Sequence, residues 1–266
     1  VKDVAEYTPM MQQYLKTKEE YKDCILFYRL GDFYEMFFDD AIVVSKELEL
    51  TLTGKSCGAE ERAPMCGVPY HAVEGYLNKL VANGHKVAIC EQVEDPKLAK
   101  GLVKREVIRI VTPGTNTDMQ ALDESKNNYI MCIVYLADKY GISLADISTG
   151  DYFVTEVDTE RKLIDEINKF APSEIICNES FYMSGVDLSD MKNRLGIAVY
   201  SLEAWYFSDE TAENTLKDHF KVQSLEGLGL SDYACGTIAA GALLRYLYET
   251  QKNDLGNLSA IHPYST

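Results

Sequence analysis

Apolar positions recur at two different periods in the first part of the chain, and these periods predict alternating helices and strands. Helices are expected after Thr8-Pro9, from Glu35 to Leu48 and from His71 to Gly84, and strands at Cys24–Leu30, Leu50–Thr53, Lys86–Gln92 and Lys104–Thr112. Residues 54–64 have no period and contain two glycines, which indicates an exposed loop. Such alternation over residues 1–115 is typical of an α/β domain built on a central mixed sheet.

A polar, aperiodic stretch at residues 116–127 has the composition of a linker and precedes a different pattern. Strands are expected at 129–136, 140–147, 151–157 and 174–177, with helices at 160–170 and 233–250. The first three strands form a predicted antiparallel meander, and the whole order is that of RNase H-like folds. Residues 128–252 are therefore predicted to be a second α/β domain of that class, and the polar residues 253–266 to begin a linker to a further domain.

The stretch from Gly31 to Phe38 holds four aromatic rings and two carboxylates between a predicted strand and a predicted helix. Gly31 permits a sharp turn and Asp32 can cap the helix behind it, which places Phe33 just before the helix N-terminus. A turn of this kind can push a side chain out of the domain. Since aromatic side chains are usually buried, physical considerations alone favour four core rings, and an exposed Phe33 is the alternative.

Charge is distributed unevenly along the 266 residues, whose net charge is −16. Residues 1–115 hold 15 basic and 18 acidic side chains, a net charge of −3, whereas the remainder holds 11 and 24, a net charge of −13. The total argues against a general electrostatic binder of nucleic acid, so any contact with a polyanion is expected in the first domain. No window approaches the roughly 20 uncharged apolar residues of a membrane span.

Local motifs for metal and nucleotide sites are incomplete. The seven cysteines form no C-x-x-C pair, which disfavours both a zinc site and a disulfide framework. Gly54-Lys55-Ser56 matches the end of a phosphate-binding loop, but that motif requires a glycine where the chain has Glu49. His71 and His85 have no third candidate ligand at a suitable spacing.

The second domain raises the alternative of a metal-dependent nuclease. RNase H-like nucleases need clustered carboxylates for two metal ions, one of them normally on the first strand, and the strand predicted at 129–136 has none. Asp146 and Asp151 are the candidate ligands, and turn or surface roles explain them better. A further alternative is a module that acts purely through protein–protein interaction.

Four motifs together resemble the N-terminal part of the MutS family of DNA mismatch-repair proteins. They are GDFYEMF at 31–37, PMCGVPYHA at 64–72, VAICEQ at 87–92 and RIVTPGT at 109–115. Residues 128–250 look like the connector domain of that family by their order of elements and by the DISTG segment at 146–150. The chain is thus expected to comprise a mismatch-recognition domain and a connector, as the N-terminal part of a longer protein.

The resemblance implies a role for particular side chains of the first domain. Phe33 is expected to wedge beside a mispaired base from the minor groove, Glu35 to hydrogen-bond to that base, and Tyr34 to serve as packing. A carboxylate near phosphates is repelled, so it persists there only with a specific hydrogen bond from a base or with a proton of its own. Contacts to the DNA backbone are predicted for Lys55, Arg62 and Met65.

Partners and cofactors also follow from the resemblance. Mismatched double-stranded DNA is the expected ligand, and the partner protein MutL is expected to bind through the connector. A homodimer, ATP and Mg²⁺ are expected only for full-length members of the family, with no catalytic residue, cofactor or metal in the present residues. The implied location is the cytoplasm, in association with the nucleoid, with no membrane contact.

Overall fold

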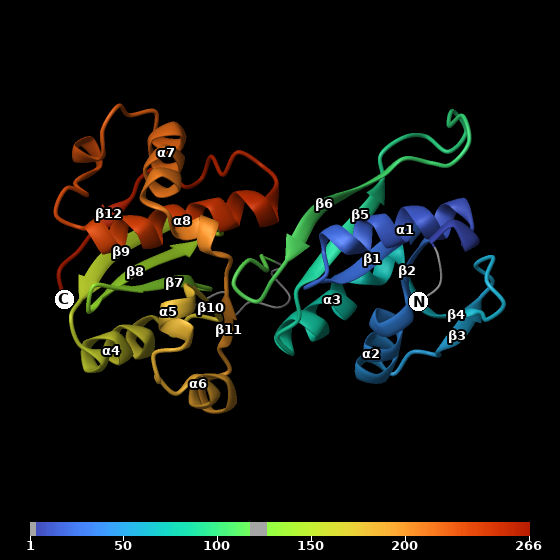
Figure 1. Ribbon diagram of the computed structural model, residues 1–266, viewed down its shortest axis with the longest axis horizontal. Helices are drawn as coiled ribbons and strands as arrows, with labels where there is room; N and C mark the ends of the chain where they lie inside the picture. Colours follow the sequence, from blue (N-terminus) through green and yellow to red (C-terminus); the bar gives the residue numbers. More distant parts are fainter. Residues whose placement is uncertain (1–3, 118–126) are drawn as a thin grey trace. The chain divides into compact units, whose positions relative to one another are not determined.

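The computed structural model describes residues 4–117 and 127–266, which form two compact α/β units divided between Thr112 and Pro113 (Figure 1). The sequence placed this boundary after Thr115. Pro113 and Gly114 belong to the second unit because the Gly114 amide donates to the buried Glu174 carboxylate at 2.9 Å. Most of the predicted linker, residues 118–126, lies outside the described residues.

The first unit is built on a mixed sheet, as predicted, and its six strands have the order β3-β4-β2-β1-β5-β6. The strands are β1 (Ile25–Leu30), β2 (Phe33–Phe37), β3 (Thr53–Lys55), β4 (Ala63–Pro69), β5 (Val87–Gln92) and β6 (Arg105–Val111). Only β1 and β5 run parallel to each other, and every other pair is antiparallel. The carboxyl ends of β1 and β5 and the first residue of β2 therefore lie at the same end of the sheet.

Helices cover both faces of this sheet (Figure 1). They are α1 (Pro9–Glu20), α2 (Phe38–Leu48) and α3 (Val73–Ala82), with the 3₁₀ turns η1 (Val4–Glu6) and η2 (Tyr70–Ala72). The predicted N-cap is present, because the Thr8 hydroxyl accepts from the Met11 amide at 3.4 Å. Helix α1 packs against one face, where it meets Tyr28 and Phe37, and α2 and α3 pack against the other.

The prediction of a strand-to-helix turn after Gly31 is wrong, because Phe33–Phe37 is a strand and α2 begins only at Phe38. Leu30 pairs with Phe33, so Gly31 and Asp32 are the two turn residues of a β-hairpin, and Asp32 caps no helix. The side chains of this strand alternate between two covered faces. This period of two over residues 33–37 is difficult to recognise in the sequence, because the apolar residues that follow have helical spacing.

Residues 53–69 also differ from the prediction. Most of the expected strand at Leu50–Thr53 is irregular, and both ends of the expected loop at 54–64 are paired strands instead, β3 with β4. β3 contains Gly54 and is an edge strand that pairs on one side only, with β4. β4 (Ala63–Pro69) is central: its residues 65–69 pair with β2, and its residues 63–65 pair with β3 on the other side.

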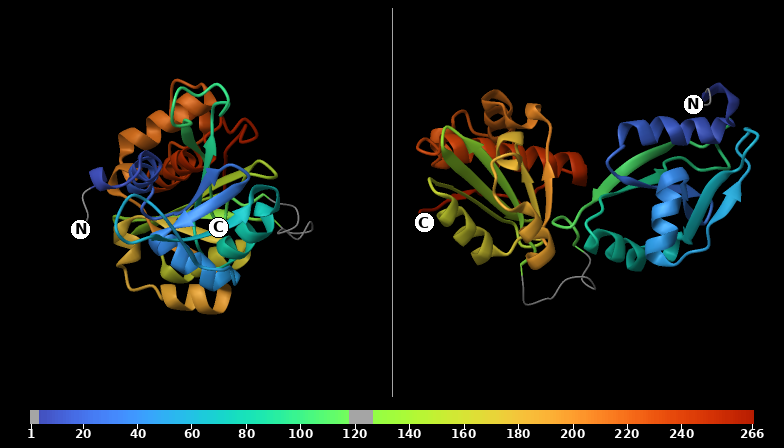
Figure 2. Two further views of the ribbon diagram at one scale, coloured as in Figure 1. Left: turned by 90° about the vertical axis from the view of Figure 1, so that its right-hand side faces the viewer. Right: turned by 60° about the horizontal axis from the view of Figure 1, so that its bottom comes forward.

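The second unit confirms the predicted RNase H-like order, with strands arranged β11-β10-β7-β8-β9-β12. The strands are β7 (Ile130–Leu136), β8 (Lys139–Asp146), β9 (Asp151–Val157), β10 (Glu174–Cys177), β11 (Ala198–Ser201) and β12 (His262–Pro263). The helices are α4 (Glu160–Phe170), α5 (Glu179–Tyr182), α6 (Leu188–Leu195), α7 (Asp209–Phe220) and α8 (Ala234–Gln251), with 3₁₀ turns η3 (Ala204–Phe207) and η4 (Leu225–Leu228). Figure 2 shows this sheet between the red helix α8 and the yellow-green helix α4.

The prediction that residues 253–266 begin a linker is wrong for most of that segment. Leu255, Leu258 and Ile261 are buried against α8, and β12 adds a strand beside β9. The Tyr264 hydroxyl donates to Glu166 on α4 at 2.7 Å. Three spaced apolar residues in a polar stretch are enough to attach the segment to the second unit.

All seven cysteines are buried free thiols. Burial raises the pKa of Cys24, Cys90 and Cys177 to about 12, so these thiols are neutral core residues. The described residues contain no helix that is long and apolar enough to cross a membrane.

Candidate nucleic-acid interface

Phe33 lies at the tip of a hairpin that is fixed by its own hydrogen bonds. Gly31 has φ +60°, a value at the first turn position that suits the type II′ hairpin and that other residues adopt with strain. Arg29 Nε donates to the Gly31 carbonyl at 2.6 Å, and the Tyr70 amide donates to the Asp32 carbonyl at 2.9 Å. The Phe33 side chain is nevertheless 47% exposed, so this ring is not a core residue.

The side chains next to Phe33 are held by a polar network on the opposite face of the hairpin. Tyr34 is buried, as predicted for packing, and its hydroxyl donates to Glu91. The Arg29 guanidinium pairs with Glu91 at 3.2 Å and lies over the Tyr70 ring at 3.9 Å. These contacts hold the hairpin rigid while Phe33 itself projects into solvent.

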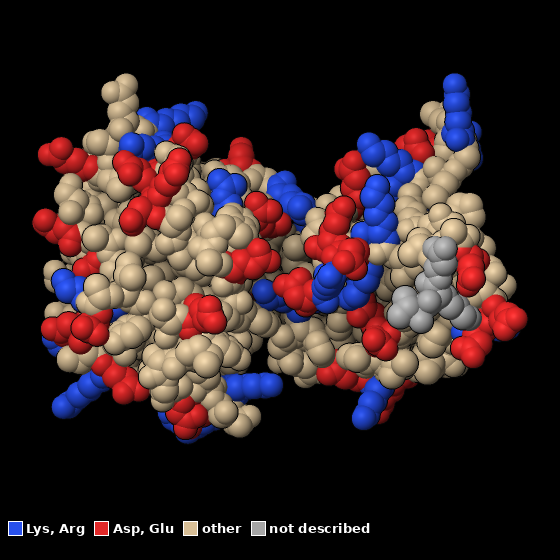
Figure 3. Space-filling model, viewed as in Figure 1, with Lys and Arg blue, Asp and Glu red and all other residues tan. Residues whose placement is uncertain are grey.

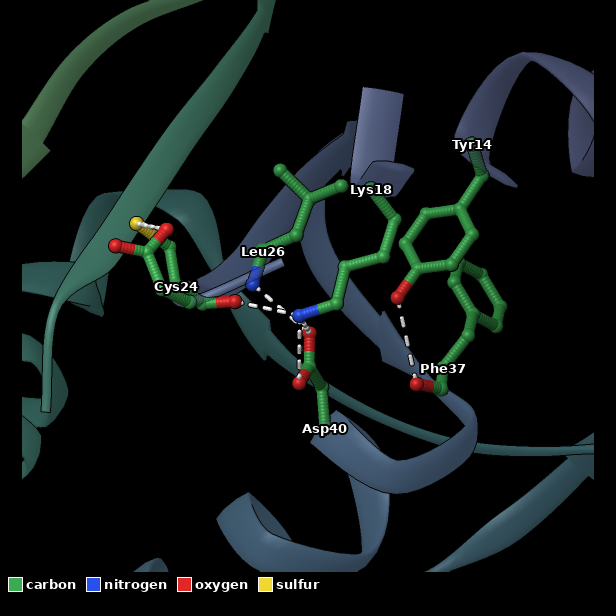
Figure 4. A network of polar contacts seen from close by, with 7 residues as sticks. Tyr14, Lys18, Cys24, Leu26, Phe37 and Asp40 are labelled. Atoms are coloured by element: carbon green, nitrogen blue, oxygen red, sulfur yellow. Dashed lines mark hydrogen bonds and ion pairs between the residues drawn. The ribbon is translucent and has the colours of Figure 1, made fainter. Parts of the chain in front are cut away.

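The far end of β2 is attached to helix α1 (Figure 4). Asp40 accepts hydrogen bonds from Lys18 Nζ at 2.9 Å and from the Leu26 amide at 3.0 Å. The Tyr14 hydroxyl donates to the Phe37 carbonyl at 3.4 Å, and burial raises the pKa of that hydroxyl. The junction between β2 and α2 is therefore fastened to both β1 and α1.

Glu35 lies on the same face of β2 as Phe33, because side chains alternate along a strand. Its side chain is 14% exposed and its carboxylate accepts a hydrogen bond from Lys55 Nζ at 3.1 Å. Gly67 is the cross-strand neighbour, and a Cβ there would lie 3.4 Å from Glu35 Cγ and 3.2 Å from the Tyr34 carbonyl. The absent side chain at position 67 thus leaves room for the Glu35–Lys55 pair.

The three residues predicted to contact the DNA backbone have different surroundings. Lys55, on β3, is brought to Glu35. Arg62 is exposed, and its guanidinium donates to the Gly54 carbonyl at 2.5 Å. Met65 lies opposite Phe37 on β4 and packs partly buried against the cluster under α1.

Sequence reasoning missed the Glu35–Lys55 pair and the Arg29–Tyr70 contact. Each joins residues on different strands, and neither pair has a local spacing that could reveal it. A period of two over residues 33–37 would have been the one available signal, because it places Phe33, Glu35 and Phe37 on one face.

The two candidate metal ligands of the second unit, Asp146 and Asp151, accept hydrogen bonds from neighbouring residues. Asp146 is buried and accepts from the Ser148 amide at 2.9 Å, the Ser148 hydroxyl at 2.6 Å and the Asn128 amide at 3.0 Å. Asp151 accepts from the Tyr129 hydroxyl at 3.3 Å. Burial, and then this carboxylate, raise the pKa of Tyr129 to about 12.

No cluster of three or more metal-binding side chains occurs within residues 4–117 and 127–266. His85 instead contacts the Glu47 carboxylate at 2.6 Å. The nuclease alternative thus gains no support from the geometry, since Asp146 serves as a turn cap.

Comparisons with known proteins match nearly the whole chain. The family model of MutS domain I matches residues 8–120, and that of MutS domain II matches residues 128–259. The DNA mismatch repair protein MutS of Lachnoclostridium phytofermentans is 66% identical over 263 residues, which are 99% of this chain and 28% of that protein. The proteins of the same name from Acetivibrio thermocellus and Ruminiclostridium cellulolyticum are 52% and 51% identical, over 98% and 97% of this chain. The chain spans 30% of the length of each of these two relatives.

Proposed function

The chain belongs to the MutS family, and from that premise we propose that its first unit recognises mismatched base pairs in double-stranded DNA. The observation that carries the proposal is the exposed Phe33 ring at the tip of a rigid hairpin, with Glu35 on the same face. The matched domains do not include the ATPase domain of the family, so no enzymatic activity is assigned to the chain.

Phe33 is proposed to test how easily the duplex deforms. Opening a base step costs a few kcal/mol and costs least at a mismatch, whereas stacking a ring on a base returns roughly 1 to 3 kcal/mol. Insertion is therefore favourable only where the duplex is already weak. The hairpin bonds of Gly31 and Asp32 support this role, because a wedge that could fold back would pay an ordering cost on insertion.

Glu35 is proposed to exchange Lys55 for a donor on the exposed base. With no DNA bound, the Lys55 ammonium balances the carboxylate at 3.1 Å. At an intact base pair the Watson–Crick donors are engaged in pairing, and the carboxylate repels the phosphates. At a mismatch the base replaces the lysine, which becomes free to approach a phosphate.

We also propose that Lys55, Arg62 and Met65 contact the DNA backbone. The exposure of Arg62 supports such a contact, since its guanidinium can reach solvent from the β3–β4 turn. Met65 is half-buried and has only part of its surface available for an apolar contact with sugar.

The second unit is proposed to act as a connector that relays DNA binding to MutL and to the ATPase domains of a homodimer. Its acidic composition favours a partner protein over DNA, because residues 116–266 carry a net charge of −13. ATP and Mg²⁺ are proposed to act in those ATPase domains, and the described residues are assigned neither. Association with the nucleoid follows from DNA binding.

The substitution Phe33→Ala tests the function directly. Fluorescence anisotropy with matched and mismatched duplexes should show loss of the preference for the mismatch, because no ring remains to fill the opened step. The control is Ile42→Ala, which removes a side chain of similar exposure, 48%, from helix α2. Normal discrimination by Phe33→Ala would contradict the proposal.

A further inference from the structure

The loop of residues 93–104, which joins β5 to β6, projects from the same end of the sheet as the Phe33 hairpin (Figure 1). Tyr28 pairs with Cys90 in parallel register, which sets Leu30 beside Gln92 at the ends of their strands. The loop thus leaves the sheet beside the hairpin turn. It also returns there, because Arg105 Nε donates to the Arg29 carbonyl at 2.8 Å.

The acidic side chains of this β5–β6 loop hold its backbone. Glu94 accepts from the Lys104 amide at 2.8 Å, and Asp95 accepts from the Lys97 amide at 2.9 Å. The base of the loop is closed by the Val93 amide, which donates to the Lys104 carbonyl at 2.9 Å. Both carboxylates therefore have structural roles inside the loop.

The remaining side chains of the loop face solvent and combine positive charge with apolar surface. Lys97 and Lys100 are exposed, and the tip of the loop at the top right of Figure 3 carries blue basic side chains. Leu98 is 79% exposed and Leu102 is 45% exposed. The chain as a whole has a net charge of −16, so two exposed lysines in a loop beside the Phe33 hairpin are unusual for its surface. Their positive charge favours contact with a polyanion such as DNA.

We propose that the β5–β6 loop is a second DNA-contacting element, which binds the phosphate backbone beside the step where Phe33 inserts. This inference rests on the function proposed above. Lys97 and Lys100 contact phosphates, and Leu98 packs on the adjacent sugars. Phosphate contacts position a protein without reading sequence, so the loop contributes affinity to matched and mismatched DNA alike.

The test replaces both lysines, as Lys97→Gln/Lys100→Gln, and measures anisotropy with each duplex over a range of salt concentrations. Affinity should fall about tenfold for both duplexes at low salt. The slope of log affinity against log salt should decrease by about 2, or about 1 for each contact removed. The matched control is Lys46→Gln/Lys79→Gln, which removes two exposed lysines from α2 and α3 and should change neither quantity.

The outcomes separate this inference from the proposed function. An unchanged salt slope in Lys97→Gln/Lys100→Gln, with discrimination still dependent on Phe33, overturns the loop contact and leaves mismatch recognition standing. An equal decrease in the control pair also overturns it, because the effect would then be one of general charge. If the unaltered chain binds neither duplex at low salt, both proposals fail.

Discussion

Glu35 in the first unit and Asp146 in the second are both carboxylates beside β-hairpin turns, and their surroundings differ in one decisive respect. Asp146 accepts three hydrogen bonds from residues of its own unit. Glu35 faces the ammonium of one flexible lysine on an edge strand. A carboxylate that accepts from two amides and a hydroxyl holds a turn in place, whereas one paired with a lysine can change partner.

The same contrast occurs within one strand. Phe33 and Phe37 point from the same face of β2, but Phe37 lies under helix α1 with its ring 4.9 Å from that of Tyr14. Phe33 lies beyond the cover of that helix. We therefore expect substitution of Phe37 to lower stability and substitution of Phe33 to affect DNA binding instead.

The largest expected effect comes from Phe37→Ala, which should reduce the stability of the first unit by about 3 to 5 kcal/mol through the cavity it leaves. Phe33→Ala should change that stability by no more than about 0.5 kcal/mol. Hydrogen exchange of the β1 and β2 amides measures both. Equal effects of the two substitutions would contradict the contrast between the buried and the exposed ring.

Asp146→Ala should destabilise the second unit by about 3 kcal/mol, because each buried donor left unsatisfied costs about 1 to 3 kcal/mol. The single tryptophan, Trp205, lies in this unit, so its fluorescence during urea unfolding reports the change. Asp151→Ala is the control and should have a smaller effect, since it removes one long hydrogen bond. A comparable loss in both variants would refute the assignment of Asp146 as the turn cap.

The smallest effects on stability are expected at the Glu35–Lys55 pair, where Glu35→Gln should cost less than about 1 kcal/mol. Its consequences should appear in DNA binding. Glu35→Gln should maintain or raise affinity for matched duplex, and Lys55→Gln should lower it, because the uncompensated carboxylate then repels phosphates. The double variant restores local neutrality and should bind matched duplex nearly as the unaltered chain does. Anisotropy titrations measure all four proteins. Glu35→Gln should raise affinity for matched duplex more in the Lys55→Gln background than in the unaltered chain, and an equal gain in both backgrounds would show that the two side chains do not act together.

The sequence by itself determined the two α/β units, the RNase H-like order of the second and the position of the aromatic stretch. These features follow from local periodicity, from composition and from four contiguous motifs, each of which is complete within a few residues. The packing role of Tyr34 was also predicted, from the resemblance to the family, and Tyr34 is buried.

Only the tertiary structure decided how Phe33 and Phe37 are covered, which cation meets Glu35 and how residues 253–266 pack on the second unit. Phe33 and Phe37 have the same chemistry and differ only in whether α1 reaches them. Lys55 lies twenty residues from Glu35 and reaches it across β4, where Gly67 has no side chain to intervene. Leu258 is buried in the core beside α8, and Tyr264 hydrogen-bonds to Glu166; the partners of Tyr264 lie far away in the sequence. Local pattern specifies the elements, but contacts between distant strands depend on how those elements pack, and the candidate interface consists of such contacts.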